Sequence, residues 1–167
     1  LQSSRSCRPR LRPPRLSSRL RLIPMLLFAL AAAHPLPAQQ TPLHWAARHG
    51  HVDLARGLLE NGAQIDVRDT LRRTPLHLAV EHPDMIRFLV QAGADLQAND
   101  SLGNTALHLA VRHNGEVALL LDLGVDPNTR NMLGATALEI AVRRGNTRRN
   151  LAVVERLVRA GATNEIR

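Results

Sequence analysis

Cysteine is nearly absent from this chain of 167 residues, and lysine and tyrosine are absent altogether. The single cysteine, Cys7, has no second thiol with which to form an intramolecular disulfide or a thiolate metal site. Aromatic residues make up only 2% of the chain, which leaves little to build a stacking platform for nucleic-acid bases. The sequence also lacks the Gly-x-Ser-x-Gly, His-Glu-x-x-His, phosphate-loop and dinucleotide fingerprints, so it gives no support to the common enzyme classes.

Acidic residues are missing from the first 38 residues, and this segment differs in composition from the rest of the chain. Seven arginines in residues 1–21 precede an apolar stretch at residues 22–33, and small residues and prolines follow up to Ala38. This order is typical of a secretory signal peptide, and twelve apolar residues are too few for a membrane span of about 20. We therefore predict a leader at residues 1–38 that is cleaved near Ala38. The protein would be periplasmic or secreted, or cytoplasmic if the leader is not a functional signal.

Most of the positive charge lies in this leader. The formal charge of +8 divides into +7 for residues 1–38 and +1 for residues 39–167, where 15 arginines face 14 acids. A nearly neutral region whose only aromatic residues are Trp45 and Phe88 lacks the usual features of a nucleic-acid-binding domain. We expect no nucleic-acid partner, and no membrane contact once the leader is removed.

A short phrase recurs four times in residues 39–167, at intervals of 33, 31 and 31 residues. Its copies begin at Thr41, Thr74, Thr105 and Thr136. The first three copies read Thr-x-Leu-His and contain His44, His77 and His108, whereas the fourth has Glu139 in place of the histidine. Each copy is followed by an apolar stretch and then a glycine, namely Gly62, Gly93, Gly124 or Gly161. Periods of this length indicate a stacked-repeat protein.

This pattern resembles the ankyrin repeat, and the resemblance covers residues 41–167. It implies an all-α solenoid of stacked helix-turn-helix units with projecting β-turn fingers. We predict one domain at residues 39–167 with four repeats at about 41–73, 74–104, 105–135 and 136–167, and we expect the fourth repeat to complete the array. The threonines are expected to cap the inner helices, and the glycines to follow the outer helices in left-handed conformation.

The histidines allow two interpretations. The resemblance implies that His44, His77 and His108 bond to backbone and to the motif threonine, so that neighbouring turns are linked. The loop histidines at positions 49, 51, 82 and 113 could align when the repeats stack, and a metal-binding or enzymatic accessory role for them is the alternative functional class. We favour the structural interpretation and expect no metal and no cofactor, because each motif histidine belongs to a different repeat and has no carboxylate at ligand spacing.

The resemblance also implies a concave binding face formed by finger tips and inner-helix ends. The apolar candidates at the tips are Leu71, Leu102, Met132 and Leu133, which could alternatively pack locally within their own turns. The cationic candidates are Arg112, Arg143, Arg144, Arg148 and Arg149. We expect a monomeric, non-enzymatic module that binds a protein partner.

The sequence departs from the repeat pattern at two places, and each departure leads to a further prediction. Arg72 stands where the next two fingers have Gly103 and Gly134, which predicts a distorted or looser first turn. The fourth repeat is lengthened around residues 143–150, which predicts a long arginine-rich hairpin loop. Such a loop would favour an anionic surface, unless it is only a solvated spacer.

Overall fold

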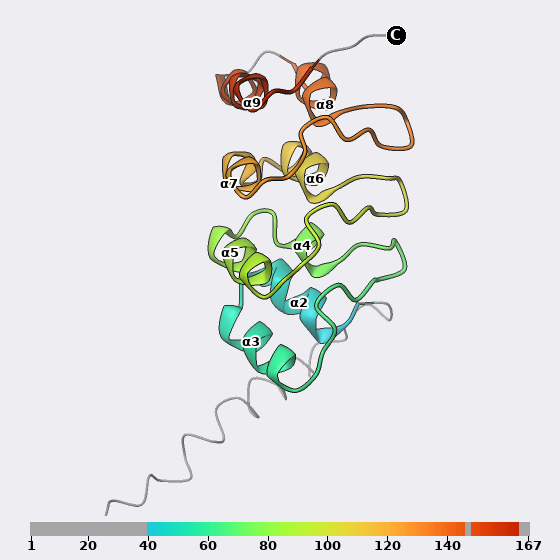
Figure 1. Ribbon diagram of the computed structural model, residues 1–167, viewed down its shortest axis with the longest axis vertical. Coiled ribbons are helices and arrows are strands. Elements are labelled where there is room, and N and C mark those ends of the chain that lie inside the picture. The colour runs from blue at the N-terminus through green and yellow to red at the C-terminus, as the bar shows by residue number, and fades with distance from the viewer. Residues whose placement is uncertain (1–39, 146–147, 164–167) are drawn as a thin grey trace, which may run out of the picture.

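Helices in stacked pairs make up the computed structural model, which describes residues 40–145 and 148–163 (Figure 1). No strand occurs in this part of the chain. The inner helices are α2 (Pro42–His49), α4 (Pro75–Leu78), α6 (Ala106–His113) and α8 (Ala137–Arg143). The outer helices are α3 (Val52–Glu60), α5 (Pro83–Gln91), α7 (Val117–Asp122) and α9 (Arg148–Arg159). The fold is thus the all-α repeat solenoid that the sequence predicts, while the predicted leader lies outside the described residues.

The helices form two layers, and each inner helix contacts the next inner helix along the stack. The chain leaves each of the first three outer helices through a long loop that projects beyond the inner layer before the next inner helix begins (Figure 1). We call these loops the fingers: finger 1 is residues 63–73, finger 2 is residues 94–104 and finger 3 is residues 125–135. They all project on the same side, so the repeats present three parallel loops in a row.

The inner helices begin where the threonines predict. Thr41, Thr74, Thr105 and Thr136 each have extended backbone and lie immediately before the first helical residue. Pro42 and Pro75 occupy the first helical position, where a missing N–H is harmless and the fixed φ suits a helix. The four glycines that follow the outer helices have φ between 87° and 95°, a left-handed conformation that residues without a Cβ adopt easily.

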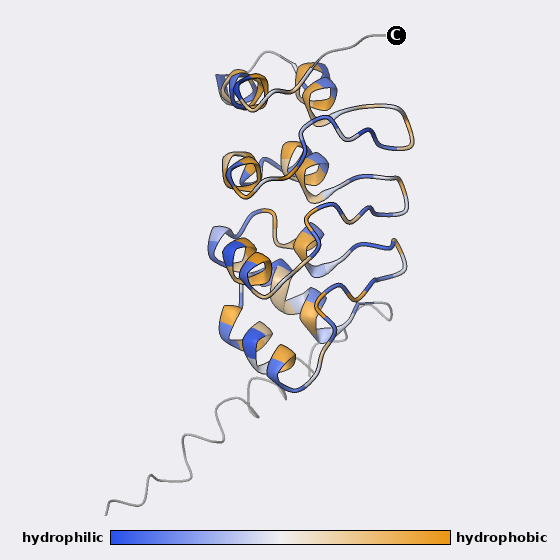
Figure 2. Cartoon of the chain, viewed as in Figure 1, coloured by the Kyte–Doolittle hydropathy of each residue, from blue (hydrophilic) through white to orange (hydrophobic). Residues whose placement is uncertain are grey.

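The core lies between the layers and between successive repeats. The motif leucines at positions 43, 76, 107 and 138 are at most 4% exposed, and the motif alanines at positions 46, 79, 110 and 141 at most 1%. Small alanine side chains let adjacent inner helices approach closely, and the leucines fill the space between the layers. The helices carry their apolar and polar residues on different sides (Figure 2), as expected for elements with one buried face.

The first finger turn is not distorted, so the prediction made from Arg72 is wrong. The Arg72 N–H donates to the Asp69 carbonyl at 2.9 Å, just as the Gly103 N–H donates to the Asp100 carbonyl at 3.1 Å. Arg72 adopts a left-handed φ of 57°. The Asp69 carboxylate holds the turn in place, because it accepts the N–H groups of Leu71 and Arg73 at 2.9 Å each and pairs with the Arg73 guanidinium at 2.7 Å.

The extra length of the fourth repeat lies mainly in its outer helix, which corrects the prediction of a long hairpin loop. Helix α8 ends at Arg143 and α9 already begins at Arg148. Helix α9 has 12 residues, whereas α3, α5 and α7 have 9, 9 and 6. Arg148 and Arg149 are therefore helical residues, and the charge run is divided between two helices.

Candidate functional site

Three buried histidines each bond to the last residue of their own repeat, immediately before the threonine cap of the next inner helix. In the second repeat, the Thr74 N–H and hydroxyl lie 3.1 and 2.9 Å from Nδ1 of His77, and Nε2 of His77 lies 2.9 Å from the Asn104 carbonyl of finger 2. A carbonyl only accepts, so Nε2 carries the proton and Nδ1 accepts from the threonine. His44 and His108 repeat this arrangement, with the carbonyls of Arg73 and Ala135 at 2.8 and 3.2 Å. The structure therefore contains the links that the family resemblance implies.

Burial keeps these three imidazoles neutral. Desolvation is the largest influence on the pKa of His44, His77 and His108, and it lowers each below the usual 6.5 despite the opposing hydrogen bond to a carbonyl. The neutral form is also the one that the geometry requires, because a second proton on Nδ1 would face the threonine N–H. These side chains are structural anchors that fix where each finger leaves the stack.

The anchors hold finger tips that are exposed and apolar. The exposed fraction is 50% for Leu71, 53% for Leu102, 76% for Met132 and 84% for Leu133. Consecutive tips are bonded to one another, since the Ser101 N–H donates to the Leu71 carbonyl at 2.8 Å and the Met132 N–H donates to the Leu102 carbonyl at 2.9 Å. The four predicted tip residues thus form one fixed row, which we call the tip row, and they are not packed away inside their own turns.

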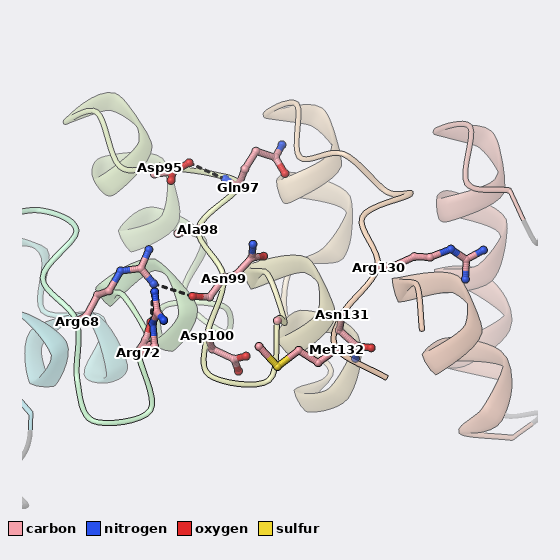
Figure 3. A pocket seen from close by; sticks show the side chains of 11 residues that line it. Arg68, Arg72, Asp95, Gln97, Ala98, Asn99, Asp100, Arg130, Asn131 and Met132 are labelled. Carbon is pink, nitrogen blue, oxygen red and sulfur yellow. Dashed lines mark hydrogen bonds between the residues drawn. The ribbon is translucent and has the colours of Figure 1, made fainter. Parts of the chain in front are cut away.

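A groove runs along the fingers beside the tip row, and sequence reasoning missed it. It has a volume of about 490 Å³ and is lined by residues of all three fingers, among them Arg68, Arg72, Asn99, Arg130 and Met132 (Figure 3). We call it the finger groove. Its signal in the sequence is weak: the residues at positions 68, 99 and 130 are 31 apart and include two arginines, a pattern that only the finger geometry makes meaningful.

The five arginines predicted to bind a partner do not form a single cluster. Arg112, Arg143 and Arg144 line a shallow hollow of about 260 Å³ together with Ile140. Arg144 is turned back onto α6, where its Nη1 donates to the carbonyls of Val111, at 2.7 Å, and Arg112. It therefore caps the end of a neighbouring helix, where a cation suits the helix dipole. Arg148 is exposed at the start of α9, and the side chain of Arg149 lies outside the described part of the structure.

Two of the loop histidines, His49 and His82, hydrogen-bond to backbone carbonyls. Nδ1 of His49 donates to the Trp45 carbonyl at 2.8 Å, and the His49 ring stacks on that of Trp45 with 4.5 Å between the ring centroids. His82 donates from Nε2 to the Arg48 carbonyl at 2.8 Å. Across residues 40–145 and 148–163, no three His, Cys, Asp or Glu side chains are grouped so as to hold a metal ion. None of the helices described is both long and apolar enough to cross a membrane.

Comparison with known families agrees with this geometry. A family model described as "Ankyrin repeats (3 copies)" matches residues 18–100 and again residues 82–167. The chain belongs to the ankyrin-repeat family. Arrays of this family are protein–protein interaction modules and are typically not enzymes, so a protein partner is the class of ligand that the fold indicates.

Similar curated proteins share single segments with this ankyrin-repeat chain. It is 51% identical over 41 residues to neurogenic locus notch homolog protein 1 of Xenopus laevis, 52% over 40 residues to a putative ankyrin repeat protein of Rickettsia bellii, and 44% over 43 residues to palmitoyltransferase ZDHHC13 of Mus musculus. These segments cover 25%, 24% and 26% of this chain. They span only 2%, 17% and 7% of the relatives, which are much longer than the matched parts.

Proposed function

We propose that this ankyrin-repeat protein is an exported binding module that holds a protein partner against its tip row and the adjoining concave face. The observation that carries the proposal is the tip row itself. Leu71, Leu102, Met132 and Leu133 are all at least half exposed, although they stand on fingers whose stems are buried and hydrogen-bonded. A row of exposed apolar side chains on a rigid support is a feature of interaction sites.

The module acts by rigid display and needs no chemistry of its own. Each finger is fixed at its base by a buried histidine and at its tip by a backbone bond to a neighbouring finger. A partner therefore meets side chains that are already in place, and it loses little conformational freedom of the array on binding. We propose that the protein works as a monomer. Size-exclusion chromatography with light scattering would check its molar mass in solution.

A capture experiment tests the binding face. The wild-type chain and a variant with Leu71→Ser, Leu102→Ser and Leu133→Ser are used as baits in extracts of the native cells and in their culture medium, and bound proteins are identified by mass spectrometry. The control is Leu151→Ser on α9, which removes from an outer helix a leucine side chain that is as exposed as Leu71, 50%. The proposal expects a specific partner that the tip variant loses and the control retains. Equal retention by the tip variant would contradict it.

Export is part of the proposal and has its own test. The support for it is the basic, apolar and small-residue order of residues 1–38. Amino-terminal sequencing of protein recovered from outside the cytoplasm should begin near Gln39. Recovery of only the intact chain from the cytoplasm would replace this proposal with that of a cytoplasmic adaptor.

A further inference from the structure

Arg72 occupies a backbone position that both equivalent turns give to glycine. Its φ is 57°, and those of Gly103 and Gly134 are 73° and 71°. A residue with a Cβ is disfavoured in this left-handed region, so glycine would suit the turn better. Strained residues concentrate at functional positions, so the Arg72 side chain is a candidate for a functional role.

The Arg72 side chain lies next to that of Arg68 at one end of the finger groove (Figure 3). Nη1 of Arg68 donates to the Arg72 carbonyl at 3.1 Å and to the Asn99 carbonyl of finger 2 at 2.7 Å. These bonds fix the Arg68 guanidinium against the groove wall without neutralising its charge. Both arginines are exposed, and neither guanidinium forms an ion pair with any carboxylate of the described residues.

The acids at the start of the two equivalent finger turns, Asp69 and Asp100, are already occupied. Asp69 pairs with Arg73 at 2.7 Å and accepts two turn N–H groups. Asp100 accepts the N–H groups of Leu102 and Asn104, both at 2.8 Å, in the equivalent turn of finger 2. Two neighbouring guanidinium groups without a counter-charge favour an external oxyanion, which a planar, multidentate donor set binds well.

The rest of the groove indicates which oxyanion. No aromatic side chain lines it, so it provides no surface on which the bases of a nucleic acid could stack. Met132 lies in the groove and also belongs to the tip row. The groove therefore has a charged end at Arg68 and Arg72 and an apolar side chain at Met132. A protein segment with a carboxylate next to an apolar side chain would place the carboxylate at the arginines and the apolar group at Met132.

We propose that the finger groove binds an acidic segment of the protein partner, with carboxylates on Arg68 and Arg72 and an apolar side chain against Met132. The inference rests on the proposed binding function and adds the charge and chemical class of the segment that is bound. Arg72 is the specificity-determining residue. The geometry of its turn favours glycine, which has no charge, and this chain has a charged side chain there instead.

The test uses the full chain and fluorescence anisotropy of labelled probes at low ionic strength. The probes are an eight-residue peptide of alternating glutamate and leucine, the same peptide with glutamine for glutamate, and a single-stranded oligothymidylate. The variants are Arg72→Gly and Arg72→Asn, both of which suit a left-handed backbone, and Arg87→Ser, which removes one exposed arginine from outer helix α5.

The glutamate peptide should bind in a salt-dependent way, and more tightly than the glutamine peptide and the oligonucleotide. Both Arg72 variants should weaken its binding about tenfold with melting temperatures no lower than wild type, while Arg87→Ser should leave its affinity unchanged. Equal binding of both peptides, equal loss in Arg87→Ser, no loss in the Arg72 variants, or tighter oligonucleotide binding would overturn the inference. In each of these cases the capture experiment with the tip-row variant still decides separately whether the proposed function stands.

Discussion

The third and fourth repeats share one motif but differ in how deeply the motif residues are buried. In the third repeat, His108 reaches the Ala135 carbonyl of the following finger, and Val111 is 4% exposed. In the fourth repeat, Glu139 stands at the histidine position and pairs backwards with Arg130 of finger 3 at 3.2 Å. Val142, the counterpart of Val111, is 57% exposed. Both motif positions, that of the histidine and that of the valine, are therefore buried in the third repeat and more exposed in the fourth.

This difference shows that residue type alone does not determine the burial of a motif position, because the same side chain is buried at Val111 and exposed at Val142. Both repeats keep the threonine cap, since the Glu139 N–H still donates to the Thr136 hydroxyl at 3.3 Å. Local helix initiation thus survives without the histidine. What the histidine adds is the link to the next finger, and through it the alignment of the tip row.

Acid should loosen the three histidine junctions together, which is the largest effect that we predict. The folded-state pKa of His44, His77 and His108 is below 6.5, so the unfolded chain binds more protons once the pH falls below that value. The histidine contribution is therefore present above about pH 6.5 and is lost as the pH falls towards the folded-state pKa. Urea midpoints between about pH 7.5 and 5 should decrease. A midpoint that does not change over this range would show that the junctions do not depend on neutral imidazole.

His77→Ala should lower the free energy of unfolding by about 2 kcal/mol, because it leaves the buried Asn104 carbonyl and Thr74 hydroxyl without their partner. The matched change in the fourth repeat, Glu139→Ala, should lower it by only about 0.5 kcal/mol, since it removes a partly exposed ion pair. Urea denaturation of both variants checks the contrast. Equal losses would mean that the link between repeats adds nothing beyond the local turn.

Val111→Ala and Val142→Ala remove the same atoms from the same motif position. The first should lower the unfolding free energy by about 1.5 kcal/mol through lost burial, and the second by less than about 0.5 kcal/mol. Thermal and urea denaturation both report this difference. A loss at Val142 as large as that at Val111 would indicate that Val142 is covered in solution.

Arg143 and Arg144 provide the smallest contrast. Arg144→Ala should lower the unfolding free energy by about 1 kcal/mol, because it removes the guanidinium that caps the carbonyl end of α6. Arg143→Ala should change it by less than about 0.5 kcal/mol. If the order is reversed, Arg144 is not the capping residue.

The sequence predicted those features that recur. Four threonines, three histidines and four glycines that recur from repeat to repeat determine the caps, the junctions and the helix ends, because each acts within its own repeat or at its border with the next one. The features that occur once escaped prediction. Arg72 keeps a glycine-like turn because Asp69 of the same finger holds the surrounding N–H groups. Arg144 turns back onto α6, a contact between residues that are distant in the sequence.

The finger groove was missed for the same reason. Arg68, Arg72 and Arg130 belong to two fingers that are separated in sequence by a third, and only the parallel packing of the fingers places them along one groove. The candidate arginines of residues 143–149 were easier to notice because they are consecutive, although the structure divides them between α8 and α9.

The central claim is that the fingers form the binding face, and hydrogen–deuterium exchange tests it most directly. Exchange is measured by mass spectrometry for the chain alone and for its complex with the captured partner. If the fingers form the binding face, binding should slow exchange at residues 70–73, 101–104 and 132–135, with little change in outer helices α3, α5 and α7. Protection that is concentrated in those outer helices, with unchanged exchange at the finger tips, would contradict it.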